Sequence, residues 1–124
     1  MPTAIGLTLR ELRRRGAIAD VVERWMPGAR RRRDLFGFAD IIAIVDGRIV
    51  AVQAYRSGVR EHVERITSDP SCRRAALAWL RAGGQIQLWW WRQLRRGARV
   101  VWRPRIHRIL IRGDGLCYRI IDDD

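Results

Sequence analysis

The chain has 124 residues and is strongly basic, because 25 arginines face 13 acidic residues and give a net charge of +12 at pH 7. Its hydrophobic content of 48% is that of a globular protein and excludes a disordered chain. Apolar runs of only about five residues are too short to cross a membrane. We therefore expect a single domain over residues 1–124, with no membrane partner.

The excess of positive charge predicts a polyanionic partner, and nucleic acid is the commonest. Arginine forks match phosphate oxygens, and binding releases condensed counterions. The absence of lysine and asparagine indicates a biased genome, which explains arginine in place of lysine but not twice as many bases as acids. The sequence therefore predicts DNA as the partner.

Several shorter signals concern the environment of the protein. The first residues, 1–12, lack the continuous apolar stretch of a signal peptide, so we expect a cytoplasmic protein. Cys72 and Cys117 lack metal-ligand spacing and are expected to be reduced. His62 and His107 have no partner motif and are expected to be structural.

The first predicted element is a helix from Thr8 to Arg15 that ends at Gly16. Residues 17–25 suit a strand because of their β-branched side chains, although a second helix also fits. After a turn at Met26-Pro27-Gly28 come four consecutive arginines, Arg30, Arg31, Arg32 and Arg33. These arginines either form a solvated loop or bind the phosphates that flank the site.

Two apolar runs, Ile41–Val45 and Ile49–Val52, are joined by Asp46-Gly47. This combination is a strong signal for a β-hairpin. Antiparallel pairing about the turn brings Asp40 and Gln53 to the same end of the sheet. Asp40 alone could equally be a turn residue or a cap, but the pair marks this end as a candidate site.

Two helices are predicted next. The first begins at Ser57 or Gly58, with Val59, Val63 and Ile66 as its buried face. The second is capped by Ser68 or Asp69, begins with Pro70 and ends at Gly83-Gly84.

Residues 85–92 alternate as a strand, and Trp89 with Trp91 either packs in the core or stacks on nucleobases; we favour the core. A short strand over Arg99–Arg103 is expected to end at Pro104, and a second hairpin turns at Gly113-Asp114-Gly115. The order α-β-β-β-α-β-β plus a hairpin predicts a mixed α/β fold with a central sheet flanked by helices.

The order of an acidic residue, a strand, a tight turn, a second strand and a polar-x-polar triplet resembles the PD-(D/E)XK nuclease superfamily, which includes Holliday junction resolvases and restriction endonucleases. Gly37-Phe38-Ala39-Asp40 stands where that family has G-x-P-D, and Gln53-Ala54-Tyr55 where it has (E/D)-x-K. The resemblance covers about residues 8–103 and implies a restriction-endonuclease-like sheet. A C-terminal hairpin over about 105–121 and an acidic tail, 122–124, would be additions to this core.

The resemblance implies an endonuclease that hydrolyses phosphodiester bonds in DNA with Mg²⁺ or Mn²⁺. Asp40 would be the principal metal ligand, joined by the Gln53 side-chain oxygen, the Ala54 backbone carbonyl and an acid from Asp34, Glu23 or Glu11. The implied catalytic residues are Asp40, Gln53, Tyr55 and Asp34, and the implied metal ligands are Asp40, Gln53, Asp34 and Glu23. The arginines expected to bind nucleic acid are Arg30, Arg31, Arg32, Arg33, Arg56 and Arg60.

Two departures leave alternatives open. Gln53 replaces an acid and Tyr55 replaces the lysine, so Arg56 or Arg60 would have to take over the role of that lysine. A weakened or inactive nuclease that only binds DNA fits these replacements, and a basic module that binds an acidic protein is a further alternative. A homodimer, as in resolvase-like relatives, also stays open.

Overall fold

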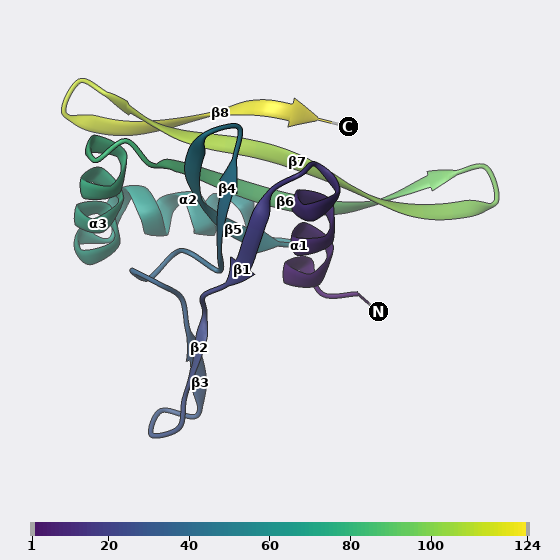
Figure 1. The fold of residues 1–124 in the computed structure, drawn as a ribbon, viewed down its shortest axis with the longest axis horizontal. Coiled ribbons are helices and arrows are strands. Elements are labelled where there is room, and N and C mark those ends of the chain that lie inside the picture. Colours follow the sequence, from purple (N-terminus) through teal and green to yellow (C-terminus); the bar gives the residue numbers. More distant parts are fainter. Residues whose placement is uncertain (1, 124) are drawn as a thin grey trace.

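The computed structural model describes residues 2–123 and has a six-stranded mixed sheet flanked by helices (Figure 1). The predicted mixed α/β class is therefore confirmed. The helices are α1 (Ala4–Arg14), α2 (Val59–Ser68) and α3 (Pro70–Arg81), and the strands are β1 (Ile18–Val21), β2 (Arg24–Met26), β3 (Arg31–Arg33), β4 (Ile41–Val45), β5 (Arg48–Tyr55), β6 (Gln85–Arg96), β7 (Arg99–Arg112) and β8 (Gly115–Asp123).

The sheet has the order β1-β4-β5-β6-β7-β8. Strands β1, β4 and β5 are antiparallel neighbours, and the crossover through α2 and α3 makes β6 parallel to β5. A parallel neighbour needs such a crossover, since a tight turn can join only antiparallel strands. Strands β2 and β3 pair only with each other and form a separate ribbon that leaves the sheet (Figure 1).

The central hairpin forms as predicted. Ile41 pairs with Val52, which places Asp40 and Gln53 at the same end of β4 and β5. Its turn has positive φ at both Asp46 and Gly47, the backbone for which an Asp-Gly pair is favoured.

Hydrophobic residues pack on both faces of the sheet. On the α1 face, Leu12 packs with Ile41, Trp89 and Trp91, so the core interpretation of these two tryptophans is confirmed. The other face is covered by α2 and α3 and buries Ile66, Leu88 and their neighbours. No helix in the described part of the chain is both long and apolar enough to span a membrane.

Three expectations about local structure are wrong. The first helix begins at Ala4 rather than Thr8, because Thr3 caps it by accepting a hydrogen bond from the Gly6 amide at 3.0 Å. Residues 17–25 contain parts of two strands instead of one. Of the two alternatives left open for the arginine run, a solvated loop does not describe Arg31–Arg33, because these residues form β3 and pair with β2.

Pro104 also does not end a strand, because β7 continues to Arg112. At Pro104 only β6 lies beside β7, since β8 pairs with β7 from Arg105 onward. Proline has no N–H to donate to a neighbouring strand. An edge position tolerates it, because on the open side of the strand no ladder hydrogen bond is lost.

Candidate metal centre

Three carboxylates converge at the end of the β4–β5 hairpin. Oxygens of Glu23, Asp34 and Asp40 lie within 4.8 Å of one another. Of the three acids that could join Asp40, the structure therefore brings two, Glu23 and Asp34, to the same place. Glu11 instead pairs with Arg14 and Arg15 on α1.

The β2–β3 ribbon explains why Glu23 meets Asp34. Its last pair at the base is Arg24 with Arg33, and Glu23 and Asp34 are the residues just outside these two strands. A short loop then brings Asp34 to Asp40, since Leu35 and Ala39 exchange two backbone hydrogen bonds of 2.9 Å and the two aspartates flank this pair.

Asp40 is fixed by the hairpin itself. Its backbone amide donates to the Val52 carbonyl at 2.9 Å, and its side-chain Oδ2 accepts from the Ala54 amide at 3.0 Å. The carboxyl group is nearly buried, at 5% exposure. Because the N–H and C=O of one strand residue point to the same side, the Ala54 carbonyl also faces the Asp40 side.

Gln53 completes the group from β5. Its Nε2 donates to Asp34 Oδ2 at 3.3 Å, while its buried Oε1 has no hydrogen-bond partner among the described residues. A buried carbonyl oxygen left without a partner costs about 1–3 kcal/mol. An orphaned oxygen beside three carboxylates therefore fits a hard divalent cation, which prefers oxygen ligands.

The raised pKa values of the clustered acids also favour a cation at this place. Burial, followed by the hydrogen bond that protonated Asp40 donates to Asp34 and by the charges of Asp34 and Glu23, raises the pKa of Asp40 well above its usual range, although the Ala54 amide opposes the shift. Burial also raises the pKa of Glu23, while the charge of Arg32 opposes the shift. A bound cation would relieve the repulsion among these groups.

Two arginines contact the carboxylates. Arg32 Nη1 lies 3.4 Å from Glu23 Oε1, and Arg65 Nη2 lies 3.5 Å from Asp34 Oδ2. Sequence reasoning missed Arg65 and named Arg56 and Arg60. Arg60 pairs with Glu64 at 3.0 Å, and Arg56 lies over the Trp102 ring at 5.8 Å. Only the position of α2 across the sheet selects Arg65, so no local pattern signals it.

Tyr55, at the position of the expected lysine, is buried and stacks on His62 with ring centroids 4.2 Å apart. Burial raises the pKa of the Tyr55 hydroxyl, so it stays protonated. Burial and, secondarily, Arg65 lower the pKa of His62, which favours the neutral form of its ring.

Comparisons of the chain with protein-family models, curated proteins and solved structures found no significant match.

Proposed function

We propose that the protein is a nuclease of the PD-(D/E)XK type that hydrolyses phosphodiester bonds in DNA with Mg²⁺ or Mn²⁺. The observation that carries the proposal is the orphaned Gln53 oxygen beside the three clustered carboxylates. Supporting it, the strand order β1-β4-β5 followed by a crossover to a parallel β6 agrees with the sheet that the resemblance implies.

In this proposal Asp34, Asp40, Glu23 and Gln53 hold the cation, with water at its other positions. The cation would supply a water of lowered pKa and neutralise charge on the phosphate. Asp40 keeps its orientation through the Ala54 amide, and Gln53 keeps its own through Asp34.

The lysine of the family motif would supply a positive charge and a transferable proton. This chain has no lysine, and we assign the two roles to different residues. Arg65 supplies a charge at the edge of the carboxylate cluster. Arginine stays protonated and cannot accept a proton. The lowered pKa of His62 favours its neutral imidazole, which can accept a proton, so we assign that role to His62.

Asp40→Asn tests the function because it removes a charge but keeps the shape of the side chain. We expect it to abolish the thermal stabilisation that Mn²⁺ gives the wild type, and to reduce metal-dependent cleavage of duplex and branched DNA at least about a hundredfold. Asp114→Asn, an exposed acid in the β7–β8 turn, is the matched control and should behave as wild type. A wild type that gains no stability from either metal would refute the metal site.

A catalytically weakened DNA-binding protein is the second candidate, favoured by Gln53 and Tyr55 in place of an acid and a lysine. It predicts stabilisation by Mn²⁺ and binding of DNA, but no cleavage of duplex, single-stranded or branched substrates. Weak or salt-independent DNA binding would instead favour an acidic protein as the partner.

A further inference from the structure

The β6–β7 hairpin extends far beyond the sheet (Figure 1). Pairing of β6 with β5 ends at Trp90, and pairing of β7 with β8 begins at Arg105. Residues 91–104 therefore form a two-stranded ribbon without a strand on either side, which we call the arm.

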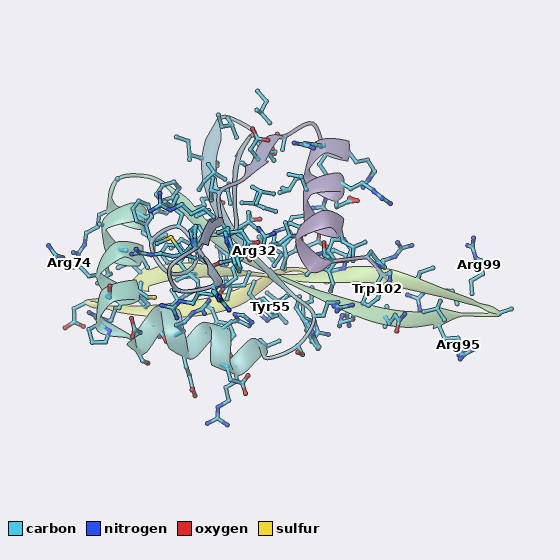
Figure 2. All side chains as sticks on the ribbon, turned by 90° about the horizontal axis from the view of Figure 1, so that it is seen from below. Arg32, Tyr55, Arg74, Arg95, Arg99 and Trp102 are labelled. Atoms are coloured by element: carbon cyan, nitrogen blue, oxygen red, sulfur yellow. The ribbon has the colours of Figure 1, made fainter. Side chains whose placement is uncertain are left out.

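Arginines face each other directly across the arm. Arg92 is opposite Arg103, and Arg96 is opposite Arg99, so all four lie on one face of the ribbon. Like charges directly opposite each other in a sheet are destabilising. Figure 2 shows Arg95, which belongs to the other face, and Arg99 pointing in opposite directions near the tip.

The outer arginines of this face have no acidic partner among the described residues. Residues 70–113 contain no acid, and within the described residues Arg96, Arg99 and Arg103 form no ion pair. All three are exposed. A face with this arrangement is stabilised by an external polyanion.

The base of the arm is held by stacked arginines and tryptophans. Arg92 and Arg105 lie over the Trp90 ring, 5.6 and 5.4 Å from its centroid, and Trp90 Nε1 donates to the Arg56 carbonyl at 3.1 Å. An isolated two-stranded hairpin is only marginally stable, so these contacts fix the arm to the sheet. A hollow lined by Arg56, Trp90 and Trp102 opens here, directly after β5, the strand that carries Gln53.

We propose that the arm binds the backbone of duplex DNA on one side of the phosphate held at the carboxylate cluster. The position of that phosphate rests on the proposed nuclease function. Binding by the arm needs no metal, so it can be tested separately.

The shape of the arm favours duplex DNA over other nucleic acids. The major groove of B-form DNA admits a two-stranded β-ribbon, whereas that of A-form RNA is deep and narrow. Proteins bind single strands by stacking the bases on exposed aromatic side chains. Between Trp102 and the tip of the arm there is no aromatic residue. Six residues per strand reach about 20 Å, which is about six base pairs at 3.4 Å each.

The test compares two triple variants of equal net charge. Arg96→Gln, Arg99→Gln and Arg103→Gln change the arm, whereas Arg74→Gln, Arg81→Gln and Arg112→Gln change exposed arginines elsewhere. Figure 2 shows Arg74 at the end of the molecule opposite the arm. The probe is a mixed-sequence DNA duplex about three helical turns long, titrated in EDTA over a series of salt concentrations.

We expect the arm variant to lose at least about tenfold in duplex affinity and to lower the salt slope by roughly 2 to 3 units, since each phosphate contact contributes about 0.9. The control should lose less than about threefold, and its hydroxyl-radical footprint should stay as long as that of the wild type. The footprint of the arm variant should shorten by about six base pairs on one side.

Equal losses in the two variants, or equal wild-type affinity for the duplex and for one of its strands, would overturn the proposal. The nuclease function fails by a different result. If the arm variant behaves as expected while the wild type neither binds Mn²⁺ nor cuts DNA, the arm stands and the enzyme does not. If the wild type cuts DNA and the arm variant binds it normally, only the arm is refuted.

Discussion

Two arginine-rich ribbons leave the sheet of this protein, and they differ in what surrounds their charges. The β2–β3 ribbon carries acids at its base, and its Arg32 pairs with Glu23 at 3.4 Å. The β6–β7 arm has arginine directly opposite arginine and no acid nearby in the chain. The same residue type therefore serves internal neutralisation in one ribbon and, in our proposal, an external polyanion in the other.

The comparison teaches that the number of arginines is a poor guide to a binding surface. Arg31, Arg32 and Arg33 form the densest basic run in the sequence, yet part of that charge is used to balance the carboxylates. The arginines of the arm are spread over two strands, and only pairing brings them together.

Gly37→Ala should disturb the carboxylate cluster without affecting the arm. Gly37 has a φ of +83°, and an added Cβ would lie 2.7 Å from Cys72 Sγ, so the loop between Asp34 and Asp40 must shift. We expect the free energy of unfolding to fall by about 2 kcal/mol, mainly from backbone strain, and Mn²⁺ affinity to fall with it. Urea denaturation and calorimetry measure these changes. Duplex binding in EDTA should stay unchanged, and a loss there would mean that the two regions are coupled.

Gln53→Glu and Gln93→Glu add the same charge to the two regions. At position 53 the new carboxylate joins the metal cluster, so Mn²⁺ affinity should rise about tenfold in calorimetric titrations. At position 93, on the exposed surface of the arm, it should leave metal affinity unchanged and weaken duplex binding severalfold. If Gln93→Glu instead raised Mn²⁺ affinity and Gln53→Glu left it unchanged, both proposed sites would be contradicted.

The pH dependence of stability should identify Asp40. Its pKa in the folded, metal-free protein is raised above the ordinary value of 3.8, first by burial and then by Asp34. The folded state thus retains a proton that the unfolded chain has lost, so the free energy of unfolding falls as pH rises from about 4 through the folded-state pKa.

Asp40→Asn should remove this loss and raise the melting temperature of the metal-free protein by a few degrees at pH 8. Thermal melts in EDTA from pH 5 to 8 measure the difference, with Asp114→Asn as the control. A variant that melts below the wild type at pH 8 would contradict the prediction, because the Asp40 carboxylate would then stabilise the metal-free fold.

The smallest effects concern single arginines, and their signs should differ. Arg32→Gln removes the partner of Glu23 and should lower the free energy of unfolding by about 0.5 kcal/mol, because the Arg32 end of this ion pair is exposed to solvent. Arg96→Gln removes a like-charge pair with Arg99 and should raise it by about 0.3 kcal/mol. Urea denaturation at low salt measures both, and the differences should shrink at high salt.

Local sequence determined the central hairpin, the α2 and α3 helices and the end of the sheet where Asp40 and Gln53 meet. These features depend on short-range chemistry: an Asp-Gly turn, the apolar spacing of Val63 and Ile66, and the Asp69 cap on Pro70. Their physical causes lie within a few residues of one another, so the sequence is sufficient to predict them.

Only the tertiary structure decided that Glu23 and Asp34 both join Asp40, that Arg65 contacts the cluster, and that Pro104 lies within a long strand. Each depends on how whole elements pair or pack rather than on a local pattern: β2 with β3, α2 across the sheet, and β6 with β7. Pairing register decides which side chains face each other, and a slip of one residue moves each side chain to the opposite face. The opposed arginines of the arm arise in the same way, from a register that neither strand specifies alone.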